Sequence, residues 1–337
     1  MPKTPTLIAQ CMFPSKSVCV NALVCAVSLF NGPFALSQNY PNKPVRVISE
    51  YVAGNGGDVF SRQILGSISL AMGQPIVVEN RGGSGGLVAV EAARRAPADG
   101  YTLLLASQNV PVTRRFLSKS EPIDPLVDLT PVSALWRTSL VFAVNPAFAS
   151  KNIHDLVDYA KSHPGKLSYS TTGMGTQGHF AGANFANITG TQLLHVPYND
   201  NRLITDVISG ELPMTIGIIS MVAPHVKAGR LRLIASAGQK RSEMFPEVPT
   251  VTEFMPNFEP PPTWTALFAP AGLPKAVLEK LNAYVVKGLA PAELRAKASG
   301  DGFDLIGNSA EEFAVQIKKD IEIAGRLVKT AKIEPTD

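Results

Sequence analysis

The chain repeats one short pattern: a β-branched strand, a loop rich in glycine and polar residues, and a helix with one apolar face. In the first part these are the strands VRVIS (45–49), PIVVE (75–79) and DGYTLLLAS (99–107), the loops YVAGNGGD (51–58) and NRGGSGG (80–86), and the helices 59–73 and 87–96. Strands separated by helices of this size imply right-handed crossovers and a parallel sheet. With 45% hydrophobic and only 17% charged residues, the chain can bury a globular core.

The pattern then starts again and predicts a second α/β unit and a helical tail. The expected strands and helices are 139–144, 152–166, 167–171, 180–188, 193–198, 200–209, 212–218, 230–237, 263–270, 275–287 and 310–330. Ser309 and Glu312 form a capping box at the start of the last helix.

Two of the expected strands look like crossings between lobes. Strands 139–144 and 263–270 are both apolar, and a proline lies at or just beyond the end of each. We therefore predict an α/β fold of two lobes, with residues 38–140 and 267–337 in lobe 1 and residues 141–266 in lobe 2. Two lobes joined by two crossings leave a cleft that closes by a hinge motion.

The N-terminal 37 residues predict a secretory signal peptide. Two lysines and no acid accompany an apolar run over 18–30, and the small residues Ala35 and Ser37 stand at the −3 and −1 positions of a cleavage site. The run is shorter than the roughly 20 apolar residues that a membrane-spanning helix needs. We expect export to the periplasm with cleavage near Ser37.

Cleavage there would remove every cysteine, because Cys11, Cys19 and Cys25 all precede it. This excludes disulfides and thiolate chemistry, and the scattered histidines have no metal-ligand spacing, so we expect neither a metal nor a cofactor. The net charge of +4 falls to +2 when the two signal-peptide lysines are removed. Without a stripe of basic residues we expect no nucleic-acid partner, and we expect a monomer.

Two of the polar loops are suited to hold an anion. AGNGGD (53–58) and STTGMGTQGH (170–179) each follow a strand and precede a helix. Loops of this kind gather at the carboxyl edge of an α/β sheet, where free amide groups and the helix dipole favour negative charge. If the two loops face each other across the cleft, they form a carboxylate clamp that needs no arginine.

At this point the chain resembles a known family, the substrate-binding receptors of tripartite tricarboxylate transporters, or Bug receptors. The similar segments are YPNKPVRVI, VVENRGGSGG, PADGYTLLLAS, LSYSTTGMGTQGHFAGANF, HVPYND, EVPTVTEF and LFAPAGLPK, in this order over residues 40–275. The resemblance implies a type II periplasmic-binding-protein fold, no catalysis, and a small organic acid closed between the lobes. It also implies delivery of that acid to membrane transporter subunits.

The resemblance assigns the ligand contacts to the two loops, through backbone amides, hydroxyl groups and ordered water. The residues that match the motifs are Gly54, Asp58, Ser170, Thr171, Thr172, Gly173, Gly175, Thr176 and His179. Where the family's first loop reads Ala-Pro-Gly-Gly, this chain has Ala53 and Asn55 in place of the proline and the second glycine. Asn55 adds an amide to the predicted site, and Asn199-Asp200 replaces the usual Lys-Gly after HVPY.

Several of these residues have an alternative structural role. Asp58 stands at a helix start, where an aspartate is usually the N-cap. His179 either contacts the ligand or holds its loop, and Tyr198 either forms a wall of the site or packs in the core. Ser107 and Gln108 end the third strand, so they either reach the cleft or cap their own loop.

One motif supports a different function. The run Gly82-Gly83-Ser84-Gly85-Gly86 satisfies G-x-S-x-G between a strand and a helix, the form of an esterase nucleophile elbow. A secreted serine hydrolase that uses Ser84 is therefore the alternative function. Glycine-rich loops match this pattern easily, and no histidine lies near the C-terminus, where such a hydrolase places it.

Overall fold

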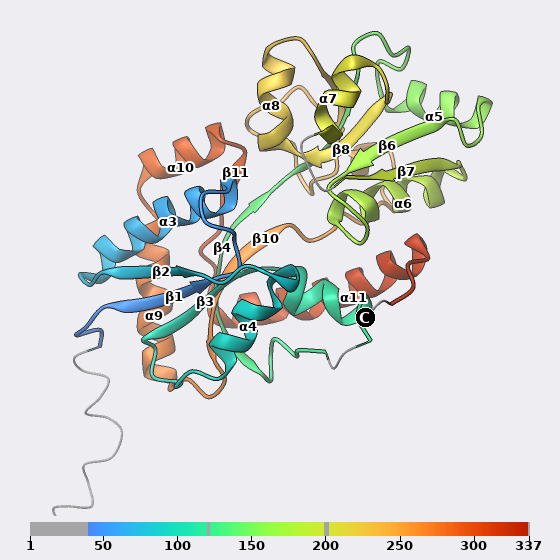
Figure 1. Ribbon diagram of the computed structural model, residues 1–337. Helices are drawn as coiled ribbons and strands as arrows, with labels where there is room; N and C mark the ends of the chain where they lie inside the picture. The colour runs from blue at the N-terminus through green and yellow to red at the C-terminus, as the bar shows by residue number, and fades with distance from the viewer. Residues whose placement is uncertain (1–39, 120–121, 199–201, 336–337) are drawn as a thin grey trace, which may run out of the picture. The chain divides into compact units, whose positions relative to one another are not determined.

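The computed structural model describes residues 40–119, 122–198 and 202–335, and the predicted signal peptide lies outside these residues. Residues 43–337 form one unit, to which all the elements below belong. Their strands form two sheets, of six and five strands, each covered by helices (Figure 1).

The six-stranded sheet has the strand order β11-β4-β10-β3-β1-β2. Its strands are β1 (Val45–Ser49), β2 (Ile76–Asn80), β3 (Thr102–Ser107), β4 (Leu129–Thr138), β10 (Trp264–Pro270) and β11 (Phe303–Leu305). The pairs β1–β2 and β1–β3 are parallel, as predicted, whereas β10 and β4 pair antiparallel to their neighbours. Here "lobe 1" means this sheet and the helices on it.

The helices of lobe 1 bury apolar faces on the sheet. They are α3 (Gly56–Met72), α4 (Leu87–Arg94), α9 (Lys275–Leu289), α10 (Ala292–Gly300) and α11 (Ala310–Ala331), with short turns η1 (Ser84–Gly86), η2 (Asn109–Thr113) and η3 (Arg114–Phe116). The predicted capping box is present, because Ser309 Oγ accepts from Glu312 N and the Glu312 carboxylate accepts from Ser309 N. Phe313 and Ile317 of this helix are fully buried in the core.

The five-stranded sheet has the order β7-β6-β8-β5-β9 and, with its helices, forms "lobe 2". Its elements are β5 (Leu140–Val144), α5 (Ile153–Ser162), β6 (Leu167–Thr171), α6 (Gln177–Thr189), β7 (Leu193–Pro197), α7 (Arg202–Ser209), β8 (Met214–Ile218), α8 (Ile219–Lys227), β9 (Arg232–Ser236) and η4 (Val251–Glu253). Two glycines let α6 approach this sheet. A Cβ at Gly178 would collide with the carbonyl of Ile216, and one at Gly182 with the ring of Tyr169.

The chain passes between the lobes at two neighbouring places in the described residues. β4 continues into β5 through Ser139 alone, and the segment after η4 returns to the first sheet at Trp264. Thr263 Oγ1 donates to the Thr138 carbonyl at 2.6 Å, and Thr138 N donates to the Thr263 carbonyl at 3.3 Å. Hydrogen bonds thus join the two crossings side by side.

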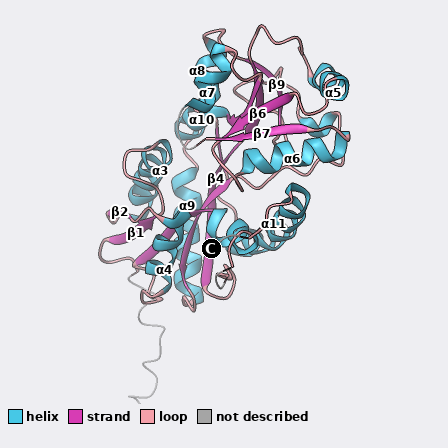
Figure 2. Ribbon diagram, turned by 45° about the vertical axis from the view of Figure 1, so that its right-hand side comes forward, coloured by secondary structure: helices cyan, strands magenta, loops and turns pink. Residues whose placement is uncertain are grey.

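A helix from each lobe also meets the other. Phe180 of α6 lies in an apolar cluster with Ile323, Leu327 and Val328 of α11, and Figure 2 shows these helices as neighbours. Phe180 is only 2% exposed. The lobes therefore share apolar contacts as well as the crossings.

Some helices and strands of the structure differ from those predicted from the sequence. β4, α8, α10 and β11 were not expected, and the predicted helix 59–73 begins three residues earlier, at Gly56. The earlier start moves Asn55 to the N-cap position, which matters for the site.

Candidate functional site

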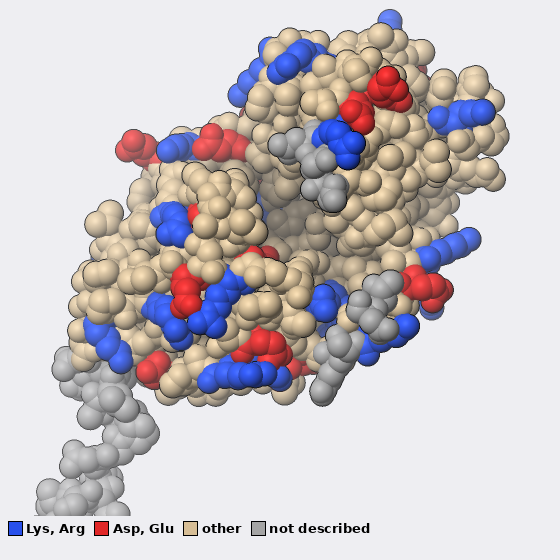
Figure 3. Space-filling view, in the orientation of Figure 1, with Lys and Arg blue, Asp and Glu red and all other residues tan. Residues whose placement is uncertain are grey.

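A cavity of about 720 Å³ lies between the two lobes, where the space-filling view is hollowed (Figure 3). Both lobes contribute polar residues to its wall: Tyr51, Asn55, Gly56, Gly57, Ser107, Gln108, Asn109, Thr138, Thr176, Gln177, Ser220, Thr263 and Thr265. Its apolar lining residues are Trp136, Leu140, Ile218, Met221, Trp264 and Phe303. No Asp, Glu, Lys, Arg or His belongs to the described lining.

The first predicted loop reaches the cavity through Asn55 and the glycines after it. Asn55 is the N-cap of α3, because its Oδ1 accepts from Asp58 N at 2.8 Å. The expectation that Asp58 is the N-cap is therefore wrong, since the helix begins earlier than predicted. Gly56 and Gly57 stand in the first turn, whose amide groups have no acceptor within the helix.

Asp58 instead organises the loop from inside. Its carboxylate accepts from Gly54 N at 2.9 Å, Asn80 Nδ2 at 2.7 Å and Arg62 Nε at 3.0 Å. Burial would raise the pKa of Asp58, but these hydrogen bonds and the Arg62 charge outweigh it, so the pKa is lowered. Neither Asp58 nor Gly54 lines the cavity.

The end of β3 brings Ser107 and Gln108 to the cavity wall. Ser107 N donates to Glu50 Oε1 at 2.8 Å, which fixes the backbone at this corner. Gln108 is only 3% exposed, yet its carboxamide has no hydrogen bond to any described residue. Its carboxamide atoms are not among the fully buried, unpartnered polar atoms of the described residues, so they keep some exposure at the cavity that Gln108 lines, where a ligand can hydrogen-bond to them.

The side chains of the second predicted loop hydrogen-bond mostly within the loop or to neighbouring elements of lobe 2. Ser170 Oγ donates to the Leu203 carbonyl at 2.7 Å, and Thr171 Oγ1 lies 2.7 Å from His195 Nε2. Thr176 Oγ1 donates to the Gly173 carbonyl at 2.8 Å. Of the predicted residues in this loop, Ser170, Thr171, Thr172, Gly173, Gly175, Thr176 and His179, only Thr176 lines the cavity.

The neighbouring residue Gln177 also lines the cavity and was missed, although it lies inside the recognised run. It is the first residue of α6, whose N-cap Thr176 makes no capping hydrogen bond through its side chain. No described residue hydrogen-bonds to the Gln177 carboxamide. The signal was available, because a polar side chain at a helix start beside a glycine loop is placed to meet an anion.

His179 holds the loop and lies outside the cavity lining. Its Nδ1 accepts from Gly175 N at 3.2 Å, and its ring stacks on that of His195, with centroids 3.9 Å apart. Burial lowers the pKa of His179 and, with the nearby His179 ring, lowers the pKa of His195 to about 4. Both rings are therefore neutral at pH 7.

Two further predicted residues, Tyr198 and Gly175, lie outside the cavity lining. Tyr198 does not line the cavity, and its hydroxyl donates to Asp206 Oδ2 at 2.5 Å. Gly175 lines a smaller hollow of about 240 Å³ next to the cavity, together with Met174 and Arg114. Asn199 and Asp200 lie outside the described residues.

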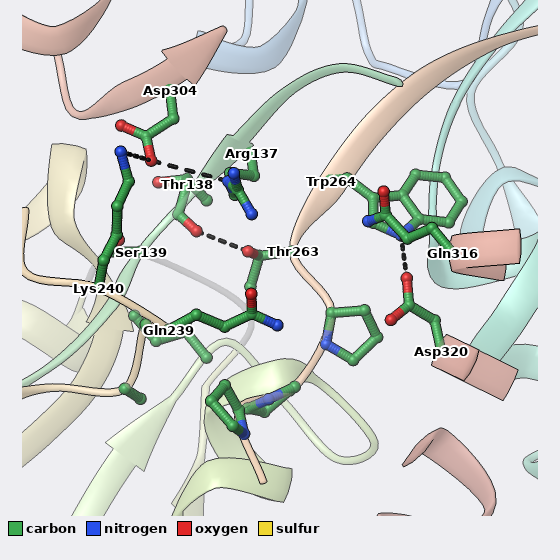
Figure 4. Close-up of a pocket in the computed structure, with 16 residues that line it drawn as sticks. Arg137, Thr138, Ser139, Gln239, Lys240, Thr263, Trp264, Asp304, Gln316 and Asp320 are labelled. Carbon is green, nitrogen blue, oxygen red and sulfur yellow. Dashed lines mark hydrogen bonds and ion pairs between the residues drawn. The ribbon is translucent and has the colours of Figure 1, made fainter. Parts of the chain in front are cut away.

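Figure 4 shows a second, smaller pocket of about 60 Å³ at the crossings, which shares Thr138, Leu140, Thr263 and Trp264 with the main cavity. Lys240 of lobe 2 lies 3.5 Å from Asp304 of β11, which also lies 3.7 Å from Arg137. Trp264 Nε1 donates to Asp320 Oδ2 at 2.7 Å. Trp264 thus anchors one crossing to α11 and also lines the cavity.

Three further features of the described part of the chain bear on metal binding, membrane spanning and hydrolysis. No group of three metal-ligating side chains occurs there, and none of its helices is long and apolar enough to span a membrane. Ser84 has a positive φ of 46°, and Arg114 donates to its carbonyl at 3.2 Å, but no described histidine hydrogen-bonds to its hydroxyl.

Comparison with known proteins places the chain among transport receptors. The model of the family described as "Tripartite tricarboxylate transporter family receptor" matches residues 60–333. The protein BugT of Bordetella pertussis is 32% identical over 256 residues, which is 75% of this chain and 78% of BugT.

Two solved structures share the fold. One, described as a periplasmic transporter, is 33% identical with a TM-score of 0.74 and covers 88% of this chain and 99% of its own. The other, Rpa4515 of R. palustris with adipate, is 27% identical with a TM-score of 0.76 and covers 88% and 100%. The predicted α/β fold of the periplasmic binding proteins is confirmed.

Proposed function

Because the chain belongs to the family of tripartite tricarboxylate transporter receptors, we propose that it captures a small organic carboxylate in the cavity between its lobes. In this proposal it is exported to the periplasm, acts as a monomer without catalysis, and delivers the acid to the membrane subunits of its transporter. The ligand-binding residues of the proposal are Asn55, Ser107, Gln108, Thr176 and, newly, Gln177.

The observation that carries the proposal is a pair of unpartnered carboxamides facing one cavity. Gln108 comes from lobe 1 and Gln177 from lobe 2, and neither side chain bonds to another described residue. Each carboxamide offers two N–H donors. A carboxylate bound between them would bridge the two lobes. Neither glutamine side chain forms such a bridge by itself, because neither hydrogen-bonds to another described residue.

The N-termini of two helices add hydrogen-bond donors and positive potential at the cavity. The first turns of α3 and α6 both border the cavity, so their free amide groups and positive dipole ends favour an anion bound there. A buried carboxylate costs several kcal/mol unless it is fully hydrogen-bonded. Since no described lining residue is a cation, these donors supply the compensation.

Closure then follows as a population shift. The acid contacts both lobes, so it stabilises the arrangement in which the two glutamines are closest. A ligand that touched one lobe equally in all arrangements would shift nothing. The relative solved with adipate supports an acid as the ligand class here.

The test is to replace each carboxamide in the purified mature protein. Gln108→Ala and Gln177→Ala should each weaken acid binding at least tenfold in titration calorimetry, because a hydrogen bond to a charged group contributes about 1.5–3 kcal/mol. The matched control is Gln192→Ala, an exposed glutamine outside the cavity, which should leave the affinity unchanged. Full affinity in both cavity variants, or no binding of any acid from a broad panel, would refute the proposal.

A further inference from the structure

The cavity floor changes from polar to aromatic along the edge of the first sheet. In the strand register Ser107 of β3 pairs with Thr265 of β10, which pairs with Trp136 of β4, which pairs with Leu305 of β11. Adjacent strands lie about 4.8 Å apart, so the backbone at Ser107 on β3 and the backbone at Trp136 on β4, two strands away, are separated by about 10 Å. Trp136 and Phe303 line the cavity at the far end.

The wall from lobe 2 changes in the same direction. Thr176 and Gln177 follow β6, whereas Ile218 ends the neighbouring strand β8 and Leu140 begins β5 beyond it. Trp136 and Leu140 are only four residues apart, because β4 runs directly into β5. The apolar ends of both walls therefore meet at the same end of the cavity.

The two aromatic side chains on the floor are held in place from behind. The buried ring of Phe60 stacks on Phe303 with centroids 4.0 Å apart and planes at 14°, and meets Trp136 edge to face at 5.1 Å. Rings fixed in this way offer a rigid surface, which suits a planar ring better than a flexible chain.

Charge excludes a second carboxylate at this end. No described lining residue is basic. Arg114 belongs to a hollow that adjoins the polar end through Asn109 and Thr176. The bases of the small pocket beside the other end, Arg137 and Lys240, lie 3.7 and 3.5 Å from the Asp304 carboxylate, which offsets their charge. Among the described lining residues near the apolar ones, only the hydroxyl of Ser220 makes no hydrogen bond within the protein, and it can meet a neutral polar substituent. A carboxylate placed against Trp136 and Met221 would be desolvated with that one hydroxyl as its donor, too few for a charged group.

Resting on the proposed function, we propose that the ligand is an aromatic monocarboxylate. Its carboxylate lies at Gln108 and Gln177, and its ring lies between Trp136 and Phe303 on one side and Ile218 and Met221 on the other. The specificity-determining residues are thus the apolar ones, which the sequence motifs did not single out.

Calorimetry on the purified mature protein tests the class directly. The probes are benzoate, phenylacetate and 4-hydroxybenzoate, compared with adipate, succinate and citrate. At least one aromatic acid should bind ten times more tightly than every di- or tricarboxylate. If a polycarboxylate binds more tightly than all three, this inference is overturned while the carboxylate receptor stands; if no acid binds, both proposals fail.

A charge placed at the apolar end tests the orientation. Met221→Lys should shift the ratio of affinities for adipate and the best aromatic acid at least tenfold toward adipate, because it supplies a cation for the distal carboxylate. The matched control is Leu70→Lys on the outer face of α3, where Leu70 is 86% exposed; it should leave the ratio unchanged. An unchanged ratio in a folded Met221→Lys variant, shown by an intact thermal transition, would place the ring elsewhere and overturn the inference.

Discussion

Glu50 is the most unusual residue beside the cavity. It follows β1, and its Oε1 accepts from Ser107 N, while its buried Oε2 has no hydrogen-bond partner among the described residues. Burial, only partly offset by the hydrogen bond from Ser107, raises the pKa of Glu50 from 4.5 to about 7. The carboxyl group thus supports the corner that carries Gln108, but its ionised form is costly there.

This leads to a pH-dependent prediction for Glu50→Gln. Because the folded pKa lies above the unfolded value, the folded state keeps a proton between pH 4.5 and about 7 that the unfolded state has lost, so this residue lowers the free energy of unfolding as pH rises through that window. Glutamine keeps the acceptor for Ser107 and removes the ionisation. The variant should gain up to about 3 kcal/mol over the wild type at pH 8 and nothing at pH 4.5. Denaturant titrations at both pH values measure the difference, and an equal gap at the two would contradict the assignment.

Residues of the site could be predicted from the sequence only where local features of the chain determine their position. Gln108 and Thr176 were predicted because strand ends and glycine-rich loops are local features, and both line the cavity. Trp136 and Phe303 were not predicted, because their place depends on strand pairing between segments about 165 residues apart in the chain. Asp58 was wrongly predicted to be the N-cap because α3 begins three residues earlier than predicted. Hydrophobic periodicity marks the ends of a helix poorly.

At the scale of elements, the parallel strands and their helices followed from hydrophobic patterning, but the antiparallel half of the first sheet did not. β4 contains Pro131 and follows a long irregular segment, so its sequence lacks the expected alternation. α8 carries Pro224 inside it, which argues against a helix from sequence alone. Tertiary contacts stabilise both elements, and local sequence patterns do not reveal those contacts.

The α6–α11 contact is such a tertiary feature, and it predicts energetic coupling between the lobes. Phe180→Ala should lower the free energy of unfolding by about 3 kcal/mol or more, because its ring is buried against Leu327 and its neighbours. In a double-mutant cycle with Leu327→Ala, the two losses should differ from additivity by at least about 0.5 kcal/mol.

Phe185→Ala is the matched control, because Phe185 is equally buried on α6 but belongs to the core of lobe 2. Its loss should add to that of Leu327→Ala. If both pairs are additive, α6 and α11 do not act as one contact in solution.

At the scale of the whole molecule, contacts at the hinge and contacts in the cavity contribute separately to the free energy of closure. Lys240 and Asp304 form an ion pair between the lobes at 3.5 Å, but the Lys240 side chain is 60% exposed. Exposed pairs of this kind contribute about 0–1 kcal/mol. In the proposed function, the contacts of the ligand with both lobes, rather than this ion pair, therefore supply the ligand-dependent part of the energy that favours the closed arrangement.

Lys240→Ala tests this division. It should change the affinity for the bound acid by no more than about fivefold in either direction, which corresponds to about 1 kcal/mol, and should leave the thermal transition nearly unchanged. Gln108→Ala, measured in the same titrations, should lose at least tenfold, although both residues lie within the same region of the crossings. A loss in Lys240→Ala as large as that in Gln108→Ala would mean that the ion pair, and not the cavity, sets the balance between open and closed lobes.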